Sequence, residues 1–315
     1  MRFWKLWDKT GIFILLLITL AIFAILTPNI LTKDNLVNIL VQTSMVAIAA
    51  AGMTFAITGG GFDLSIGATL TIATCILGKN IPIMGLWPAF ALTIAVGAVL
   101  GAINGFIITK FKVQTFVATL ATMVLYRGVA LIYTQGRDAT LMNNREIKIF
   151  SGGDIFSIPV PIFLTVLIFV LAYIVYKYTP FGLYVRSIGS NQTASRISGL
   201  QVDRVIIWIF VITAVTAAIA GTIQTSQLLT GNATFGKGFE LEVITATILG
   251  GTSLAGGRGN VWGTLSAAIM LGIIKNGLNL LSVTDNYQRL VTGLILILAL
   301  SMSGIREIVK KGAMA

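Results

Sequence analysis

Long apolar runs constrain this chain more than any other feature of its sequence. Runs of close to 20 residues, such as GIFILLLITLAIFAILTPN at 11–29, recur along the whole length. A helix needs about 20 apolar residues to cross the hydrocarbon core of a bilayer. Charged residues make up only 10% of the sequence, whereas soluble domains carry about 25%. We therefore predict a protein that crosses a membrane many times.

The continuity of the runs distinguishes helices from a barrel. Backbone polar groups in lipid must be paired within the protein, so only helices or closed barrels span it. Barrel strands would alternate polar and apolar residues over about ten positions, and these runs do not alternate. We predict an all-α polytopic membrane protein with a single transmembrane domain over 1–315. Its ten expected spans are 11–27, 36–57, 65–79, 87–108, 115–134, 160–177, 204–226, 242–256, 261–281 and 288–304.

The charges predict which side each loop faces. Ten spans put both termini on one side, and that side then holds 13 of the 22 Lys and Arg residues and 4 of the 11 acids. The other side holds 7 basic and 7 acidic residues, while Arg127 and Lys275 fall within spans. Basic residues are enriched in cytoplasmic loops. We therefore expect both termini in the cytoplasm and explain the net charge of +11 without a nucleic-acid partner.

Several residue types that catalysis commonly uses are missing. The sequence has no histidine, and its single cysteine, Cys75, lies in an apolar run, so an intrachain disulfide is impossible. The segment GNATFGKG at 231–238 resembles a phosphate-binding loop, but Gly238 stands where that motif needs Ser or Thr. We therefore expect that the chain is not an enzyme and binds neither a metal ion nor a cofactor.

Two connections are too long to be simple turns. The segment 135–159 is expected on the outer side and 178–203 on the inner side. Within the inner one, GSNQTASRISGL predicts a short helix capped by Ser190 or Asn191 and ended by Gly199. So short a helix is marginal alone. It either packs on the protein's own surface or inserts into a groove of a cytoplasmic partner.

The stretch TGGGFDLSIG at 58–67 predicts a corner at the inner ends of the second and third spans. Gly60 and Gly61 permit a tight turn. Asp63 is expected to cap the third span by accepting the N–H of Ser65 or Ile66. The alternative is a moving corner near an inner gate, also formed by Gly60, Gly61, Asp63 and Ser65. An ion site is not expected, because no partner acid or histidine is in view.

The charges and glycines inside the spans also have structural interpretations. Arg127 and Lys275 are expected to reach the interface or to pair with a helix-end carbonyl, and the alternative for Arg127 is a role at the outer vestibule. The small-residue patches 97–105 and 249–260 predict close helix packing.

Six segments in register resemble the membrane permeases of ribose-type bacterial ABC importers. These segments are ILTPNILTKDNLVNILVQTS (25–44), GMTFAITGGGFDLSIGATL (52–70), TFVATLATMVLYRGVALIYTQG (115–136), FGLYVRSIGSNQTASRISGLQV (181–202), ILGGTSLAGGRGNVWGTL (248–265) and NGLNLLSVTDNYQRLV (276–291). Relatives move ribose, xylose, arabinose, galactose and similar solutes, and the outer-half motifs look closest to the ribose members. Branched-chain amino-acid permeases are more distant relatives, and the GGxDLS corner looks like the sugar branch.

The resemblance implies a homodimeric permease of the type II importer fold in the bacterial inner membrane. A sugar-binding protein would dock outside, and a separate ATPase carrying ATP and Mg would dock inside. The short inner helix would be the coupling helix, with its contacts among Gly189, Asn191, Ala194, Ser195, Arg196 and Gly199. Relatives often carry an acid just after the position of Asn191, where this chain has Gln192 and Thr193. The resemblance therefore does not imply charge pairing with the ATPase at that point.

An uncharged sugar needs a low-affinity passage with few polar contacts. The candidates for lining it are Asn104, Gln224 and Asn276. Three alternatives stay open: import of another small solute such as xylose, galactose or a nucleoside, ion-coupled secondary transport, and a scaffold or sensor without transport. Secondary transporters typically place acids near the midplane, and the sequence shows no clear acid there.

Overall fold

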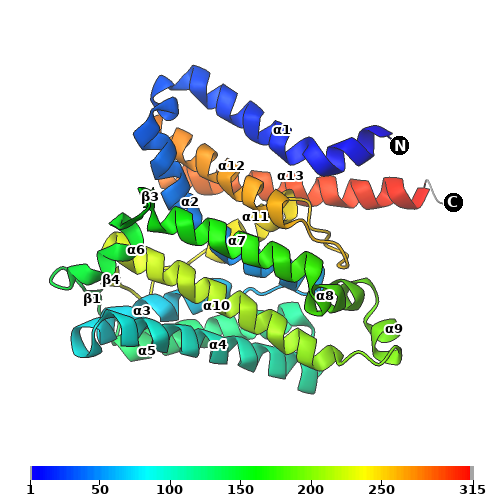
Figure 1. Cartoon of the computed structure of the whole chain (residues 1–315), viewed down its shortest axis with the longest axis horizontal. Helices are drawn as coiled ribbons and strands as arrows, with labels where there is room; N and C mark the ends of the chain where they lie inside the picture. The colour runs from blue at the N-terminus through cyan, green and yellow to red at the C-terminus, as the bar shows by residue number, and fades with distance from the viewer. Residues whose placement is uncertain (1, 313–315) are drawn as a thin grey trace.

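The long apolar runs form helices that lie side by side in one bundle (Figure 1). The computed structural model describes the chain path over residues 2–312 and the side chains over 11–301, with 285 excepted. The basic side chains near both termini, which the charge count used, lie outside that range. The predicted class, an all-α polytopic membrane protein, is confirmed.

Nine helices of 19 residues or more occur over residues 2–312. They are α1 (Arg2–Leu26), α2 (Lys33–Thr58), α3 (Ile66–Met84), α4 (Leu86–Lys110), α5 (Thr115–Thr134), α7 (Val160–Tyr178), α10 (Val202–Leu228), α12 (Val261–Leu280) and α13 (Asp285–Gly312). The shorter elements are η1 (Pro28–Leu31), β1 (Ala139–Thr140), η2 (Arg145–Lys148), α6 (Ile149–Gly152), β2 (Asp154–Ile155), β3 (Ile158–Pro159), α8 (Pro180–Ser190), α9 (Gln192–Ile197), β4 (Thr230–Gly231) and α11 (Phe239–Leu249).

The expected count of ten spanning helices is not confirmed. Among the side chains that the structure describes, 7 helices are long and apolar enough to cross a membrane. α1 and α13 add the shorter apolar stretches Gly11–Leu26 and Asn286–Ser301. The expected span 242–256 is not one continuous helix, because α11 ends at Leu249 and residues 250–260 form an irregular connection.

α10 lies at the centre of the bundle and packs against α2, α3 and α4. Its alanines at 214, 217, 218 and 220 are fully buried, so neighbouring helices approach closely. On α4, Gly97, Gly101 and Gly105 are four residues apart and therefore share one face, and that face meets α10. The predicted helix packing at 97–105 is confirmed. The other patch, 249–260, is an irregular connection whose glycines pack against the ends of α8 and α12.

The segment 135–159 covers one end of the bundle. Leu141 and Ile147 are fully buried there, and Phe150 stacks on Phe90 of α4 with 5.2 Å between ring centroids. β1 pairs with β4 in antiparallel register, and β2 pairs with β3. These contacts order a connection that the sequence predicts only as a long polar loop.

The opposite end of the bundle carries α8, α9 and both chain termini (Figure 1). This placement agrees with the expected even number of crossings. It puts the 178–203 segment and the termini on the same side, as the charge count predicts.

The α4–α10 contact provides a stability test. A Cβ at Gly101 would overlap the carbonyl oxygen of Phe210 and lie 2.7 Å from Cα of Val211, whereas a Cβ at Gly128 on α5 would meet no atom within 4 Å. We expect Gly101→Ala to destabilise the detergent-solubilised protein by ~1–3 kcal/mol through overpacking. Gly128→Ala should leave stability equal or raise it by up to ~1 kcal/mol, because alanine favours helix.

The measurement is the melting temperature, followed by size-exclusion chromatography after heating. Equal melting temperatures for Gly101→Ala and Gly128→Ala would contradict the close α4–α10 contact.

Candidate functional site

The most unusual feature of the bundle is a non-helical interruption in its interior, residues 231–238, which is called the break below. After α10, residues 231–238 run beside α3 without forming a helix, and α11 begins only at Phe239. Gly231 packs against Thr74 and Gly78 of α3, while Gly236 packs against Gly67. Residues 67–78 of α3 cover about 16 Å at the helical rise. The first turn of α11 therefore lies deep inside the bundle.

Hydroxyl groups of α3 donate to backbone carbonyls in this irregular segment. Thr71 donates to the carbonyl of Phe235, and Thr74 donates to that of Asn232 at 3.3 Å. A Cβ at Gly67 would overlap both the Gly236 carbonyl oxygen and the Glu240 carboxylate. Only glycine at position 67 lets the segment lie this close to α3.

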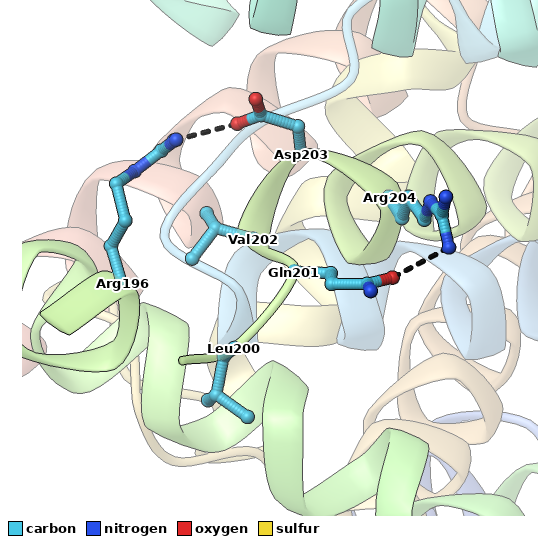
Figure 2. A pocket seen from close by; sticks show the side chains of 6 residues that line it. All are labelled: Arg196, Leu200, Gln201, Val202, Asp203 and Arg204. Atoms are coloured by element: carbon cyan, nitrogen blue, oxygen red, sulfur yellow. Dashed lines mark hydrogen bonds and ion pairs between the residues drawn. The ribbon is translucent and has the colours of Figure 1, made fainter. Parts of the chain in front are cut away.

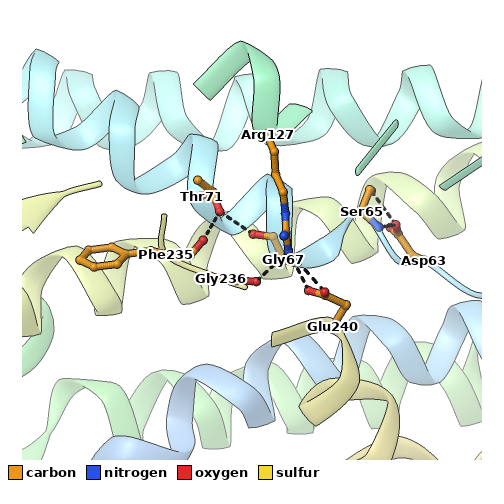
Figure 3. Close-up of polar contacts among 8 residues, drawn as sticks. All are labelled: Asp63, Ser65, Gly67, Thr71, Arg127, Phe235, Gly236 and Glu240. Atoms are coloured by element: carbon orange, nitrogen blue, oxygen red, sulfur yellow. Dashed lines mark hydrogen bonds and ion pairs between the residues drawn. The ribbon is translucent and has the colours of Figure 1, made fainter. Parts of the chain in front are cut away.

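An ion pair connects α5 to the break and to the first turn of α11. Nη2 of Arg127 donates to both carboxylate oxygens of Glu240, at 3.3 and 3.4 Å, and to the carbonyl of Gly236 at 3.3 Å (Figure 3). Glu240 is 8% exposed. The carboxylate also lies in the first turn of α11, where the helix dipole favours negative charge. The structure thus gives Arg127 a carbonyl from the turn before α11, in place of the helix-end carbonyl that the sequence predicts, and adds an acid.

This acid corrects the sequence analysis in two respects. The charge count placed Glu240 on the outer side, whereas it is buried at the break beside Gly67. The sequence showed no clear acid near the midplane, and it therefore did not indicate this buried acid. The other charge within a span, Lys275, lies 3.6 Å from Glu242, and both side chains are partly exposed.

The predicted corner forms a second buried polar cluster. Asp63 Oδ1 accepts the backbone N–H of Ser65 at 2.9 Å and its hydroxyl at 2.6 Å, just before α3 begins. The predicted bond to Ser65 is present. Asn104 of α4 donates to the Ser65 hydroxyl at 2.7 Å and accepts from the Tyr126 hydroxyl at 3.2 Å. The cluster links three helices, and it lies above the inner end of α4 because Asn104 precedes Lys110 by six residues.

The second oxygen of the Asp63 carboxylate is different. Within the part of the chain that the structure describes, Oδ2 of Asp63 has no hydrogen-bond partner, and the residue is fully buried. Among those same residues, no group of three or more acids or cysteines could hold a metal ion. The N-cap of α3 is Ser65, which makes no side-chain capping bond. Asp63 is therefore not the cap that the sequence predicts: its carboxylate closes a turn just before the helix and keeps one unsatisfied acceptor.

The three candidate passage residues do not come together. Asn104 is fully buried in the corner cluster. Asn276 of α12 exchanges amide hydrogen bonds with Asn35 of α2 at 2.9 and 3.0 Å. Gln224 lies half-buried on α10. The amide pair joins two helices, a role that the sequence could not indicate because the partners are 241 residues apart.

The inner loop contains the expected short helix. In α9, the Asn191 side chain accepts the N–H of Ala194 at 2.9 Å, and Gly199 ends the helix with φ +83°. Ser195 is buried, but Ile197 is 83% exposed. Arg196 pairs with Asp203 at 2.6 Å beside an open pocket (Figure 2). The structure thus leaves the apolar face of α9 uncovered by this chain.

Glycines join this loop to the corner. Gly189, at the end of α8, packs against the carbonyl of Thr58 and against Gly257. Gly257 in turn donates its N–H to the Thr58 carbonyl at 2.8 Å. A Cβ at Gly60 would meet Gly189 at 3.7 Å. The end of α8, the end of α2 and the start of the corner therefore meet backbone to backbone.

Comparison with known proteins places this architecture. A bundle of apolar helices with a broken crossing inside is typical of the class of polytopic transport proteins. Residues 35–300 match the family described as branched-chain amino acid transport system, permease component, so the chain belongs to this family of permeases. Its members are permease subunits of ABC importers, and the chain is accordingly a transport subunit and not an enzyme. No solved structure matches the chain.

Several similar proteins carry names that specify a transported sugar. The chain is 38% identical over 291 residues to the ribose import permease protein RbsC of Haemophilus influenzae, covering 91% of this chain and 90% of the relative. It is 41% identical over 295 residues to RbsC of Bacillus subtilis, covering 93% and 91%. It is 33% identical over 310 residues to the L-arabinose transport system permease protein AraH of Escherichia coli, covering 98% and 94%.

The contribution of the Asp63 carboxylate to stability can be measured by comparison with that of an exposed acid. Asp63→Ala removes the acceptor of two buried Ser65 donors, and we expect it to lower the free energy of unfolding by ~1–3 kcal/mol. Asp203→Ala removes an ion pair whose side chains are 56% and 51% exposed, and such pairs contribute about 0–1 kcal/mol. Melting curves of the two purified variants check the order, and a larger loss for Asp203→Ala would contradict it.

Proposed function

We propose that this chain is the membrane permease of an ATP-driven, binding-protein-dependent importer of ribose. The observation that carries the proposal is the similarity to ribose permeases over at least 90% of each chain. The D-allose and L-arabinose permeases of Escherichia coli are less similar to this chain, at 32% and 33% identity. The family description names branched-chain amino acids, but the curated relatives named above handle sugars.

Energy would come from a separate cytoplasmic ATPase that holds ATP and Mg. α9 is the segment suited to meet it, because Ile197 is exposed and the helix follows directly from the glycine junction at Gly189. Movement of α9 would pass through Gly189 to Thr58 and then to the corner at Gly60, Gly61, Asp63 and Ser65. In this proposal the corner moves near the inner gate.

The remaining assignments complete the assembly. Two copies of the chain would form the passage, with both termini in the cytoplasm and a sugar-binding protein on the opposite side. Ion-coupled transport is the less favoured alternative, because the interior acid Glu240 is already neutralised by Arg127. Other small solutes, including xylose, galactose and nucleosides, remain alternatives for the same importer.

Reconstitution tests the function. The chain, its candidate ATPase and its candidate binding protein are placed in liposomes, and uptake of labelled ribose is measured beside allose and arabinose. We expect uptake that requires ATP and all three proteins, with ribose moved fastest. ATPase stimulation without ribose uptake would keep the importer class and reject the substrate. Uptake by this chain alone under an ion gradient would reject the class.

The coupling helix has a matched test. Ile197→Ser removes the exposed apolar side chain of α9, and we expect binding-protein-stimulated ATP hydrolysis to fall about tenfold, as for an interface hot spot. The control is Ile83→Ser. Ile83 is 78% exposed, but it lies at the end of α3 that is far from the corner. Equal ATPase rates for the two variants would contradict a docking role for α9.

A further inference from the structure

Three charged residues lie in or beside the break. Arg127 and Glu240 form the ion pair described above, with side-chain exposures of 25% and 11%. Lys237, which follows Gly236 directly, and Thr234 are exposed in the same irregular segment. The break is therefore open on one face, and that face carries polar and charged residues.

The environment of this face follows from its chemistry. A lysine exposed to lipid deep in a bilayer is costly, and intramembrane charges almost always face the protein interior or water. Irregular backbone at membrane depth is tolerated only where it is buried in protein or lines a water-filled cavity. Lys237 and Thr234 are not buried by this chain. The open face of the break is therefore better suited to border an aqueous space than lipid.

The ion pair has spare hydrogen-bonding capacity. Arginine carries five N–H donors, and the contacts of Arg127 use only Nη2. Within the described residues, its Nε is buried without an acceptor and is out of reach of a ligand, so the remaining N–H groups of the guanidinium are the ones that can donate to a ligand. The Glu240 carboxylate has lone pairs beyond those that Arg127 occupies. A ligand with neighbouring hydroxyl groups can accept from the guanidinium and donate to the carboxylate at once.

We propose that Arg127, Glu240 and Lys237 form a contact site for a neutral polyol inside the passage. The inference rests on the proposed function and names the residues that would meet the sugar. Glu240 accepts from adjacent hydroxyls, while Arg127 and Lys237 donate to them. Because Arg127 and Glu240 already satisfy each other, the polyol gains little by binding. Weak binding of this kind suits a passage that must release its solute.

The test measures sugar movement and ATP hydrolysis in the same liposomes. The importer is reconstituted with Glu240→Gln, which removes the charge without changing the shape. The matched control is Glu242→Gln, two residues along the same helix, whose side chain is 35% exposed and 3.6 Å from Lys275. We expect Glu240→Gln to lower the ribose moved per ATP hydrolysed by about tenfold. Glu242→Gln should change that ratio by less than about twofold.

Two results would overturn the proposal. One is an equal ratio of ribose to ATP in the Glu240→Gln and Glu242→Gln importers. The other is loss of uptake and of ATP hydrolysis in the same proportion in Glu240→Gln, which would assign the ion pair to folding or coupling.

A second measurement is independent of transport. Lys237→Cys is introduced into the otherwise complete importer with Cys75→Ala, and a charged, membrane-impermeant thiol reagent is added. We expect labelling of Lys237→Cys that blocks uptake. Absence of labelling, with full reaction of a lipid-soluble maleimide, would show that the face meets lipid and would overturn the proposal.

Failure of the proposed function gives a different pattern. If the unaltered importer moves another neutral polyol and not ribose, the Glu240→Gln ratio is measured with that polyol. If it moves no polyol but labels at Lys237→Cys, the face borders water and the sugar function is rejected. The two failures are therefore distinguishable.

Discussion

The structure depends on satisfying the backbone of residues 231–238 inside the bundle. A membrane-spanning helix pairs its own N–H and C=O groups, but an irregular segment leaves some of them free. Here the partners come from two neighbouring helices: hydroxyls of Thr71 and Thr74 from α3, and the guanidinium of Arg127 from α5. The missing side chain at Gly67 allows the approach. One crossing is thereby made partly of irregular chain and partly of the helix α11.

This broken crossing explains why charges are present in an apolar interior. An isolated Arg127 or Glu240 would be costly there, and removing one partner of a buried pair leaves the other uncompensated. The pair instead fixes α5 against the start of α11 and holds the carbonyl that the break exposes. The Asp63 cluster also joins helices, since its hydrogen bonds connect the start of α3 to α4 and α5. Hydrogen bonds and glycine contacts, more than apolar burial, therefore distinguish one helix arrangement from another in this bundle.

The sequence predicts the helices well and their interruptions poorly. Apolar runs indicate most spans because span length is a local property, and the cap at Asn191 with its stop at Gly199 is equally local. The α4–α10 contact is readable from Gly97, Gly101 and Gly105 at helical spacing. The point at which α11 ends could not be predicted. The sequence VITATILGG continues an apolar run past Leu249, and only tertiary contacts end the helix there. Gly236 and Gly238, both with positive φ, were the available signal that a helix could not begin earlier.

The candidate site shows the same division. The corner residues are adjacent in sequence, so their cluster was predictable, but the contribution of Tyr126 required the fold. The Arg127–Glu240 pair joins residues 113 positions apart, and the charge count assigned them to different regions. Asn276 was selected as a polar residue in an apolar helix, a description that fits a helix-joining amide as well as a passage residue. Composition shows that a polar group is present and leaves its partner undetermined.

Residues 229–249 cross the bundle as an irregular segment followed by the short helix α11. The most direct test is a cryo-EM map of the permease in a lipid nanodisc, at a resolution that shows the backbone of this region. We expect irregular, non-helical density for 231–238 along α3, a helix that begins at Phe239, and the Arg127 side chain directed at Glu240. A continuous helix through 229–249, with Arg127 directed away from it, would contradict this arrangement.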